Sequence, residues 1–492
     1  MSNKTIALRL DPGQLRVWHL KLATRIEALQ NAPVVIVWGQ SQMPCPGTSA
    51  LLFEFERLIH RLPSLGLMQK IDASSFKHLS VTLPADSQLI DLCGGPEDLG
   101  VPAWKLTYDG MCGEGAALNA LLGDHPPRLQ LVAEHVCIAN AQPGVESANV
   151  RLRAMNDIAA RTISFIIAAL SRSGVTHESG LALSDAPRSV TSTMLLKAVC
   201  KGLARAVAMQ LLHLCYNTPH WKVGWRFTRD FDFILTGRHP ETGWNTIPDD
   251  GKHFYADPFP VIRDGRTHIF VENFCHKDGY GHIAVMEFEQ DGRPGAVRPA
   301  LNLGSHLSYP FVFEAEGEMW MMPESSTKRN LVLYRAAHYP DTWVPEVTLL
   351  EGMEVSDATL VKHQGKWWMM ASVRDEGGSY SDMLHIWSAA NFRGPWLPHG
   401  ANPLLIDAAR ARPAGSVFSL NGKLMRPVQD CTSYYGKSVT MMEITRLDDS
   451  GFAQSEVSVL KAGPNWAGRK LHIFNRAGDL EVIDGSAWGR KF

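Results

Sequence analysis

The pattern of apolar and polar positions changes near residue 250, and the two halves of the chain predict different elements. In the first half, stretches with an apolar residue at every third or fourth position alternate with short apolar runs. Asp11 followed by Pro12 is typical of a helix start. The expected helices cover residues 13–29 and 51–62, and the expected strands cover residues 34–38 and 87–93. This alternation predicts a small parallel α/β domain over residues 1–145.

A helical connector is predicted next, over residues 146–219. Its two helices are expected at residues 154–171 and 192–216. In the second helix, Lys197, Lys201 and Arg205 recur at every fourth position and therefore share one face. Two interpretations are open: a solvated face on a connecting helix, or contact with an anionic lipid or phosphate surface.

Beyond residue 250 a unit of about 50 residues repeats five times. Each unit is a strand, a tight turn with glycine, and a second strand rich in aromatic residues or methionine, which is the pattern of a β-hairpin. The turn glycines are Gly265, Gly317, Gly365, Gly422 and Gly478, at steps of 52, 48, 57 and 56 residues. Repeats of this length predict a five-bladed β-propeller over residues 220–492.

The fifth hairpin lies close to the end of the sequence, so its outer strands are expected from elsewhere in the chain. We expect WKVGWRF at 221–227 or FDFILTG at 231–237 to supply them and close the ring. Third strands are expected at residues 332–336, 383–389 and 439–445. The tryptophans and methionines of the second strands are expected to pack between blades, and we assign them no cofactor role.

Composition excludes some classes of function. Lys and Arg total 48 and Asp and Glu total 50, so the formal net charge is -2 and a general nucleic-acid binder is not supported. Eight scattered cysteines without metal-ligand spacing favour reduced, structural thiols. Neither a secretory signal nor an uncharged membrane span is recognisable, so a cytoplasmic protein is expected.

Candidate chemistry lies at two equivalent positions of the repeat. The positions eight residues before the turn glycine and seven residues after it are polar in most units, and the residue type differs from unit to unit. Packing alone would repeat one residue type, so this variation predicts a lined pocket at the propeller axis. The candidates from these positions are Asp257, Tyr309, Asp357, Glu272, Glu324 and Gln429, with His472 of the fifth hairpin as a further substrate-binding candidate.

Paired carboxylates at one mouth are what glycoside cleavage requires, because one acts as base or nucleophile and another as acid. Under this hypothesis Asp257 is the base, Glu324 the acid and Asp357 the residue that tunes the acid. The alternative is that each Asp at a strand start caps a turn. No cofactor and no metal ligand are assigned.

The second half resembles the five-bladed propellers of the glycoside hydrolase family 43 and 68 clan. YADPFPVIRDG (255–265) is similar to the first-blade motif that carries the general base, which implies that role for Asp257. EVSDATLVKHQGKWWMMAS (354–372) is similar to the motif of the tuning Asp, which implies that role for Asp357. In the clan that Asp belongs to the second blade, where this chain has Tyr309, and the usual motif of the acid is absent.

A closer resemblance is to the N-terminal propeller of plant glucosamine inositolphosphorylceramide transferases. YADPFPV, YPFVF, MMPESS, DATLV, AGSVF and HIFNRAGDLEVIDG all resemble its blades, over roughly residues 220–490. In those proteins a separate glycosyltransferase domain carries out sugar transfer. The resemblance therefore implies the propeller and leaves transferase activity open.

The first half resembles bacterial formyltransferase-like domains in LRVWHLKLATRIEAL (15–29), LLFEFERLIHR (51–61) and VPAWKLTYDG (101–110). Enzymes of that kind use 10-formyltetrahydrofolate and need an Asn, a His and an Asp. The corresponding stretch, residues 100–115, contains Asp109 but no His and no Asn. The resemblance therefore implies a degenerate formyltransferase-like domain.

Three hypotheses of function follow. The leading one is a carbohydrate-active protein whose propeller channel binds a sugar or glycoconjugate, with cleavage or transfer left open. The second is a folate-dependent N-formyltransferase acting on an amino sugar or other amine, with 10-formyltetrahydrofolate as its cofactor. The third is a non-catalytic recognition module. No nucleic-acid partner is expected, and the oligomeric state is open.

Overall fold

The computed structural model describes residues 5–76, 83–95, 100–172, 189–289 and 291–491. The chain forms two compact units, and each is described by itself. The first unit comprises residues 1–207 together with the short segments 375–379 and 432–434. The second unit comprises residues 208–374, 380–431 and 435–492.

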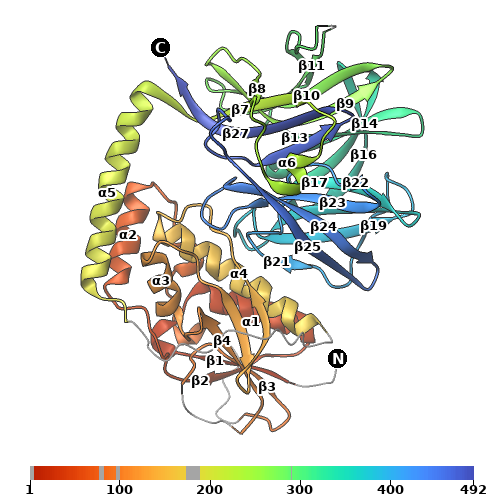
Figure 1. Ribbon diagram of the computed structural model, residues 1–492. Coiled ribbons are helices and arrows are strands. Elements are labelled where there is room, and N and C mark those ends of the chain that lie inside the picture. Colours follow the sequence, from red (N-terminus) through yellow and green to blue (C-terminus); the bar gives the residue numbers. More distant parts are fainter. Residues whose placement is uncertain (1–4, 77–82, 96–99, 173–188, 290, 492) are drawn as a thin grey trace. The chain divides into compact units, whose positions relative to one another are not determined.

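The first unit contains a six-stranded sheet with the strand order β2-β1-β3-β4-β5-β6 (Figure 1). Its strands are β1 (Ile6–Leu10), β2 (Val35–Trp38), β3 (Gln88–Asp91), β4 (Ala103–Tyr108), β5 (Leu129–Ala133) and β6 (Val136–Ala141). Strands β1 to β4 pair in parallel, as predicted, but β5 and β6 pair antiparallel. The prediction of a purely parallel sheet was wrong there, because Glu134 and His135 both have positive φ and join β5 to β6 in a tight hairpin.

The first unit also contains helices. They are α1 (Val17–Gln30), α2 (Ser49–Ile59), α3 (Glu114–Leu122) and α4 (Arg151–Ser171), with short 3-10 turns η1 (Pro12–Gln14), η2 (Gly66–Met68) and η3 (Ala73–Ser75). Helix α5 (Ser192–Cys215) begins in this unit and ends in the second, which starts at residue 208. Asp11 caps η1 through a bond from the Gly13 amide to its Oδ1, at 2.8 Å. The predicted helix start is therefore present, although the regular α-helix begins five residues after Pro12.

One helix in the described part of the chain, α4, is long and apolar enough to cross a membrane. The structure buries 72% of its most apolar window. It packs against α1, α2 and α3, so it is a core helix of the first unit. Of the two helices expected in the connector, α4 thus lies within the first unit, and α5 leads toward the second.

The cations of α5 contact the first unit. Lys201 Nζ lies 2.5 Å from Asp124 Oδ2, and Arg205 donates to Asn149 Oδ1 at 2.6 Å. Two of the three basic residues that the sequence placed on one face are therefore engaged by their own unit. These contacts compete with the proposed attraction to an anionic surface.

The second unit consists of five small antiparallel sheets, which are the blades of the predicted propeller (Figure 1). Blade 1 contains β9 (His253–Arg263), β10 (Arg266–Cys275), β11 (Tyr280–Glu287) and β12 (Arg298–Leu301). Blade 2 contains β13 (Ser308–Ala315), β14 (Glu318–Glu324), β15 (Asn330–His338) and β16 (Thr342–Glu351), with η4 (Ser326–Lys328) after β14. Blade 3 contains β17 (Glu354–His363), β18 (Lys366–Arg374), β19 (Met383–Ala389), β20 (Leu397–Pro398) and β21 (Leu405–Ile406).

Blade 4 contains β22 (Phe418–Leu420), β23 (Lys423–Asp430), β24 (Ser438–Asp448) and β25 (Gly451–Lys461). Blade 5 contains β26 (Ile473–Ala477), β27 (Leu480–Arg490), β7 (Tyr216–Phe227) and β8 (Asn245–Thr246). The five predicted hairpins and the predicted third strands are all present.

The fifth blade closes the ring with a strand from the beginning of the unit. Strand β7 pairs antiparallel with β27, with Trp225 opposite Val482. The prediction for residues 221–227 is therefore confirmed. The alternative, residues 231–237, was wrong: this segment forms the short helix α6 (Asp232–Thr236), which packs on β25 and buries Phe233.

Aromatic and methionine side chains of the second strands fill the spaces between blades. Trp320 and Met321 of β14 are fully buried, and so is Met369 of β18. They belong to one apolar cluster that joins blades 1, 2 and 3. The packing role predicted for these residues is confirmed. None of the eight cysteines, all within the described residues, forms a disulfide bond.

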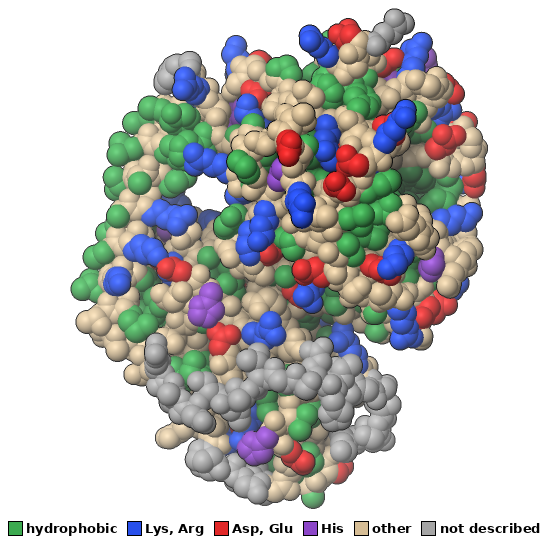
Figure 2. Space-filling view, viewed as in Figure 1, with side chains coloured by type: hydrophobic (Ala, Val, Ile, Leu, Met, Phe, Trp, Pro, Cys, Tyr) green, Lys and Arg blue, Asp and Glu red, His purple; other side chains and the backbone are tan. Residues whose placement is uncertain are grey.

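Charged side chains on the face of the propeller seen in Figure 2 alternate in sign. Over the described residues of that face, lysines and arginines lie among aspartates and glutamates, without a large patch of one charge. This agrees with the near-neutral composition of the chain.

Ring closure can be tested at Gly485 of β27. A side chain there would overlap the carbonyl oxygen of Lys470, so the backbone must shift. We expect Gly485→Ala to lower the free energy of unfolding of the propeller by about 1–3 kcal/mol, measured by denaturant unfolding. Gly400→Ala is the matched control, because no atom lies within 4 Å of its added methyl group. Equal stability of both variants would contradict tight packing at the closing blade.

Candidate functional site

A bulge interrupts the innermost strand of three blades at the same place. Asp257, Tyr309 and Asp357 have φ angles of +50°, +43° and +54°, and the pairing register shifts at each of them. A bulge takes one residue out of the ladder and redirects its side chain. The three positions that the sequence repeat singled out are thus the bulge residues.

Each bulge amide donates to a carboxylate of the preceding blade. The Asp257 amide donates to Asp484 Oδ2 at 2.8 Å, across the junction of blades 5 and 1. The Tyr309 amide donates to Asp257 Oδ2 at 2.9 Å. The Asp357 amide donates to Glu324 Oε2 at 3.1 Å. The repeat therefore places three carboxylates where they satisfy backbone groups that the bulges leave free.

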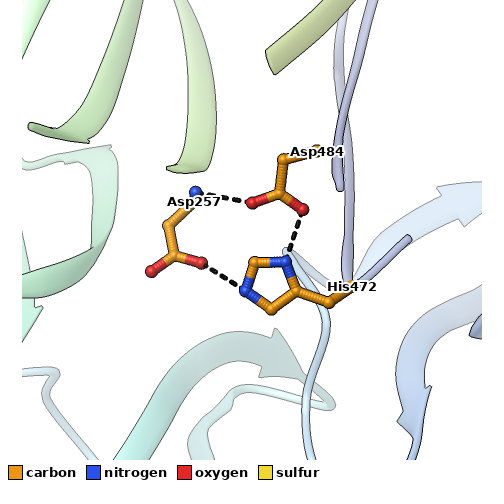
Figure 3. A group of neighbouring side chains, drawn as sticks. All are labelled: Asp257, His472 and Asp484. Carbon is orange, nitrogen blue, oxygen red and sulfur yellow. Dashed lines mark hydrogen bonds and ion pairs between the residues drawn. The ribbon is translucent and has the colours of Figure 1, made fainter. Parts of the chain in front are cut away.

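His472 lies between two carboxylates, and its ring nitrogens point at both of them (Figure 3). Nε2 is 3.1 Å from Asp257 Oδ1, and Nδ1 is 2.5 Å from Asp484 Oδ1. All three side chains are buried. Burial lowers the pKa of His472, but Asp484 and Asp257 outweigh it and raise this pKa to about 10. His472 is therefore a buried cation held by two aspartates.

The pKa values of the two aspartates in this trio shift in opposite directions. Burial raises the pKa of Asp257, but His472, the Tyr309 amide and Arg412 together outweigh burial and bring this pKa below the usual value. Burial raises the pKa of Asp484 above its usual value. The same imidazolium therefore lies between one aspartate whose pKa is lowered and one whose pKa is raised.

Asp257, His472 and Asp484 also offer ligand atoms that all lie within 4.8 Å of one another, close enough for a metal ion. Both ring nitrogens already face a carboxylate, and Asp484 accepts the amides of Asp257 and Ile473 as well. Because these ligand atoms already have partners within the protein, the arrangement fits an ion-paired trio better than a metal centre.

A second polar cluster surrounds Asp357. Its Oδ2 accepts from Arg412 Nε at 2.6 Å and from Gln429 Nε2 at 3.0 Å. Burial raises the pKa of Asp357 to about 7, although Arg412 opposes this shift. The Arg412 guanidinium lies 4.8 Å from the centre of the Tyr435 ring, which is half-buried.

Glu272 and Glu324 occupy equivalent places in blades 1 and 2. Glu272 is buried, and burial together with nearby Asp257 raises its pKa well above the usual value. Glu324 is half-buried and accepts the hydroxyls of Ser326 and Ser356, in addition to the Asp357 amide. Glu324 is thus the predicted carboxylate with the most exposure to solvent.

Tyr309 lies in the core rather than at the mouth. Its hydroxyl is 2.8 Å from Thr359 Oγ1 and accepts the Gly415 amide at 2.9 Å, and its side chain has no exposed surface. In this structure it joins blades 2, 3 and 4. The remaining candidates share one network of ion pairs, hydrogen bonds and electrostatic interactions.

Sequence reasoning missed two members of this network, Asp484 and Arg412. Glu272 and Glu324 lie opposite the residue before a bulge. Gln429, at the equivalent position of blade 4, lies opposite Arg412, and its amide donates to the Arg412 carbonyl oxygen. In the fifth hairpin the equivalent carboxylate is six residues after the turn glycine instead of seven, which hid Asp484. Arg412 precedes the aligned repeat, and its only signal was a basic residue before a strand start.

Asp109, which the resemblance to formyltransferase-like domains singled out, stabilises a turn in the first unit. Its Oδ1 accepts the Arg128 amide at 2.8 Å, and its Oδ2 lies 3.1 Å from His125 Nε2. Its φ of +50° places it in the left-handed region. Both carboxylate oxygens are thus engaged locally.

The segment that matches a known protein family lies in the propeller. Residues 246–484 match the family described as glucosamine inositolphosphorylceramide transferase 1, N-terminal. This confirms the resemblance that the blade motifs indicated. The formyltransferase-like character of the first unit is not confirmed by this match, which begins after it.

Curated relatives match the same region. Glucosamine inositolphosphorylceramide transferase 1 of Oryza sativa subsp. japonica is 34% identical over 247 residues, which is 47% of this chain and 33% of the relative. The Arabidopsis thaliana protein of that name is 33% identical over 232 residues, or 45% of this chain and 30% of the relative. The chain thus spans about a third of the length of the curated relatives it matches.

Solved structures with some likeness include glycoside hydrolases. A family 117 glycoside hydrolase of Zobellia galactanivorans has a TM-score of 0.36 at 13% identity, covering 53% of this chain and 90% of that chain. An exo-β-1,3-galactanase of Phanerochaete chrysosporium has a TM-score of 0.34 at 13% identity, covering 45% and 57%. We draw nothing about activity from likenesses at these scores.

The buried trio predicts a pH-dependent effect of His472→Gln. Removing one partner of a buried ion pair costs about 3–5 kcal/mol. The pKa of His472 rises from 6.5 to about 10 on folding, so its stabilisation is complete below pH 6.5 and is lost as pH rises through about 10. Denaturant unfolding should show a deficit that is largest near pH 6 and shrinks toward pH 10.

The matched control for this variant is His338→Gln, at an exposed position of β15. It should leave stability unchanged at every pH. A deficit for His472→Gln that is constant between pH 6 and pH 10 would contradict a protonated imidazole.

Proposed function

We propose that the propeller binds a sugar or glycoconjugate at the end of its axis where the bulges lie. One observation carries the proposal: Asp257, His472, Asp484, Asp357 and Arg412 form a charged network in the part of the chain that matches the family model. Buried charges cost free energy even when they are paired. Such a concentration at the axis is more typical of a binding site than of a packing core.

The half-buried members of the network are suited to contact a ligand. Glu324 offers carboxylate oxygens, which accept bonds from sugar hydroxyl or amino groups. Tyr435 offers an aromatic ring, whose centre is 5.3 Å from that of His472. Trp221 packs against both, with its ring centre 4.2 Å from that of His472 and 5.9 Å from that of Tyr435. Fixed acceptors beside aromatic rings match the alternating polar and apolar surfaces of a sugar.

The names of the curated relatives support the same class of ligand, because they mention glucosamine and a phosphorylated inositol lipid. The matched segment is the part of those proteins that this chain shares. We propose a sugar or glycoconjugate ligand on this basis, and we assign no transferase activity to the chain.

Binding can be tested by titrating the full chain with glucosamine, glucose and inositol and following saturation-transfer NMR. We expect at least one of them to bind saturably. Glu324→Gln should weaken binding about tenfold or more, because a bond to a charged acceptor contributes about 1.5–3 kcal/mol. Thermal unfolding of the variant shows whether the ring is intact.

Glu318→Gln is the matched control, since Glu318 is an exposed residue at the other end of strand β14. It should bind like the unaltered protein. The proposed site would be contradicted if Glu324→Gln bound with the same affinity as Glu318→Gln. It would also be contradicted if the unaltered protein bound none of the three compounds saturably.

A second candidate function, glycoside cleavage or transfer, is favoured by the opposite pKa shifts of two neighbouring carboxyl groups. The pKa of Asp257 lies below its usual value and that of Glu272 well above it. Such a pair supplies a base and a protonated acid at neutral pH. Under this candidate Asp257 is the base, while Glu272 is an acid alternative to Glu324.

Cleavage is tested with a panel of p-nitrophenyl glycosides. If the chain turns over any of them, Asp257→Asn should reduce turnover about 100-fold or more, because a positioned base contributes at least that factor. Asp264→Asn, in the exposed hairpin turn of the same blade, is the control. Turnover that survives Asp257→Asn would remove Asp257 from the chemistry, and absence of turnover across the panel would leave binding as the function.

A further inference from the structure

A small pocket lies in the first unit, beside strand β1. This strand lies between β2 and β3, so the chain runs from β1 to its neighbour β2 on one flank and then crosses to β3 on the other flank. Ligands of open α/β sheets bind at such switch points, beyond the carboxyl ends of the strands. Leu10 at the end of β1 and Leu92 just after β3 line the pocket.

The polar lining comes mainly from six side chains: Asp11, Gln14, His19, Ser41, Tyr108 and Glu114. Asp11 follows β1, and its Oδ2 accepts the Ser41 amide at 2.9 Å. Glu114 begins α3 and is held by Arg16 Nε at 2.5 Å and by Trp18 Nε1 at 2.6 Å. These bonds fix both carboxylates at the rim of the pocket.

His19 has a free hydrogen-bond donor in this pocket. Its Nδ1 accepts the Arg16 amide at 3.1 Å, so the proton of the neutral ring is on Nε2. Nε2 lies 4.0 Å from Glu114 Oε1, which is too far for a hydrogen bond, and it makes no hydrogen bond to the described residues. The side chain is only 5% exposed. A donor of such a mostly buried side chain, without a protein partner, calls for a ligand group or water.

Burial lowers the pKa of His19 to about 4, so the ring is neutral at pH 7. Glu114 is balanced by Arg16, and Asp11 leaves the polar lining with one net negative charge. This net negative charge would repel an anion. An ammonium group cannot accept the bond that His19 offers, and an apolar group would leave the polar lining unsatisfied.

We infer that this pocket binds a hydroxyl group of a neutral, polyhydroxylated small molecule. A hydroxyl both accepts and donates. The hydroxyl oxygen can accept from His19 Nε2 while its O–H donates to Glu114 or Asp11. A group that only accepts or only donates cannot make both bonds. The pocket is a second binding site, within the first unit and independent of the propeller residues.

The test uses the full chain labelled with ¹³C at histidine Cε1. The His19 resonance is assigned by its absence from His19→Leu. Titration with glycerol should move this resonance saturably, whereas acetate and methylammonium should not move it at the same ionic strength. Only a linear drift with glycerol, or an equal response to acetate or methylammonium, would overturn the inference.

A second variant measures the pocket without removing the reporter. Ser41→Ala deletes one lining hydroxyl and should weaken glycerol binding about threefold to tenfold, which is the contribution of one hydrogen bond. Ser74→Ala, on the exposed surface of the same unit, should bind as before. An unchanged affinity in Ser41→Ala would place the site elsewhere. In Glu324→Gln the His19 response should persist, which separates this pocket from the propeller site.

Discussion

The propeller depends on bonds between bulge amides and buried carboxylates. A bulge at Asp257, Tyr309 and Asp357 takes each backbone amide out of its own ladder. The amide then needs an acceptor, and the neighbouring blade supplies one in Asp484, Asp257 or Glu324. Each such bond to a charged acceptor contributes about 1.5–3 kcal/mol. The same bonds fix the angle between blades at the axis, where apolar side chains alone would allow sliding.

The bonds from the bulge amides also orient the carboxylates of the candidate site. The carboxylates are held in place by backbone groups, so their orientation does not depend on a ligand. Asp257 and Asp357 are also neutralised by His472 and Arg412. Most of their bonding capacity is thereby used within the protein, while Glu324 and Tyr435 retain some exposure. A preorganised acceptor site of this kind favours recognition, and chemistry would need one of these internal bonds to be exchanged.

The sequence allowed the propeller to be predicted because its signal is repetitive. Turn glycines at nearly constant steps fixed the hairpins, and in three blades the residue eight positions before the glycine proved to be the bulge. The first unit carried a weaker signal: strand β1 was not predicted, and the antiparallel strands β5 and β6 depend on a local turn at Glu134 and His135.

The site could be predicted only where side chains follow the repeat. Glu272 and Glu324 were found because their spacing from the turn glycine is the same. Asp484 escaped because the fifth hairpin is one residue shorter, and Arg412 because it reaches Asp357 from outside the aligned segment. That His472 bridges two aspartates could not be predicted from the sequence, since its partners are 215 and 12 positions away.

The pairing of strand β7 with β27 also has a consequence for biosynthesis. One partner leaves the ribosome more than 250 residues before the other. At a rate of about 5–20 residues per second, β7 waits for at least roughly ten seconds with its edge uncovered. The first unit can fold during that interval, whereas the ring can close only after β27 has been translated, so the nascent propeller is a natural client for chaperones that shield unpaired strands.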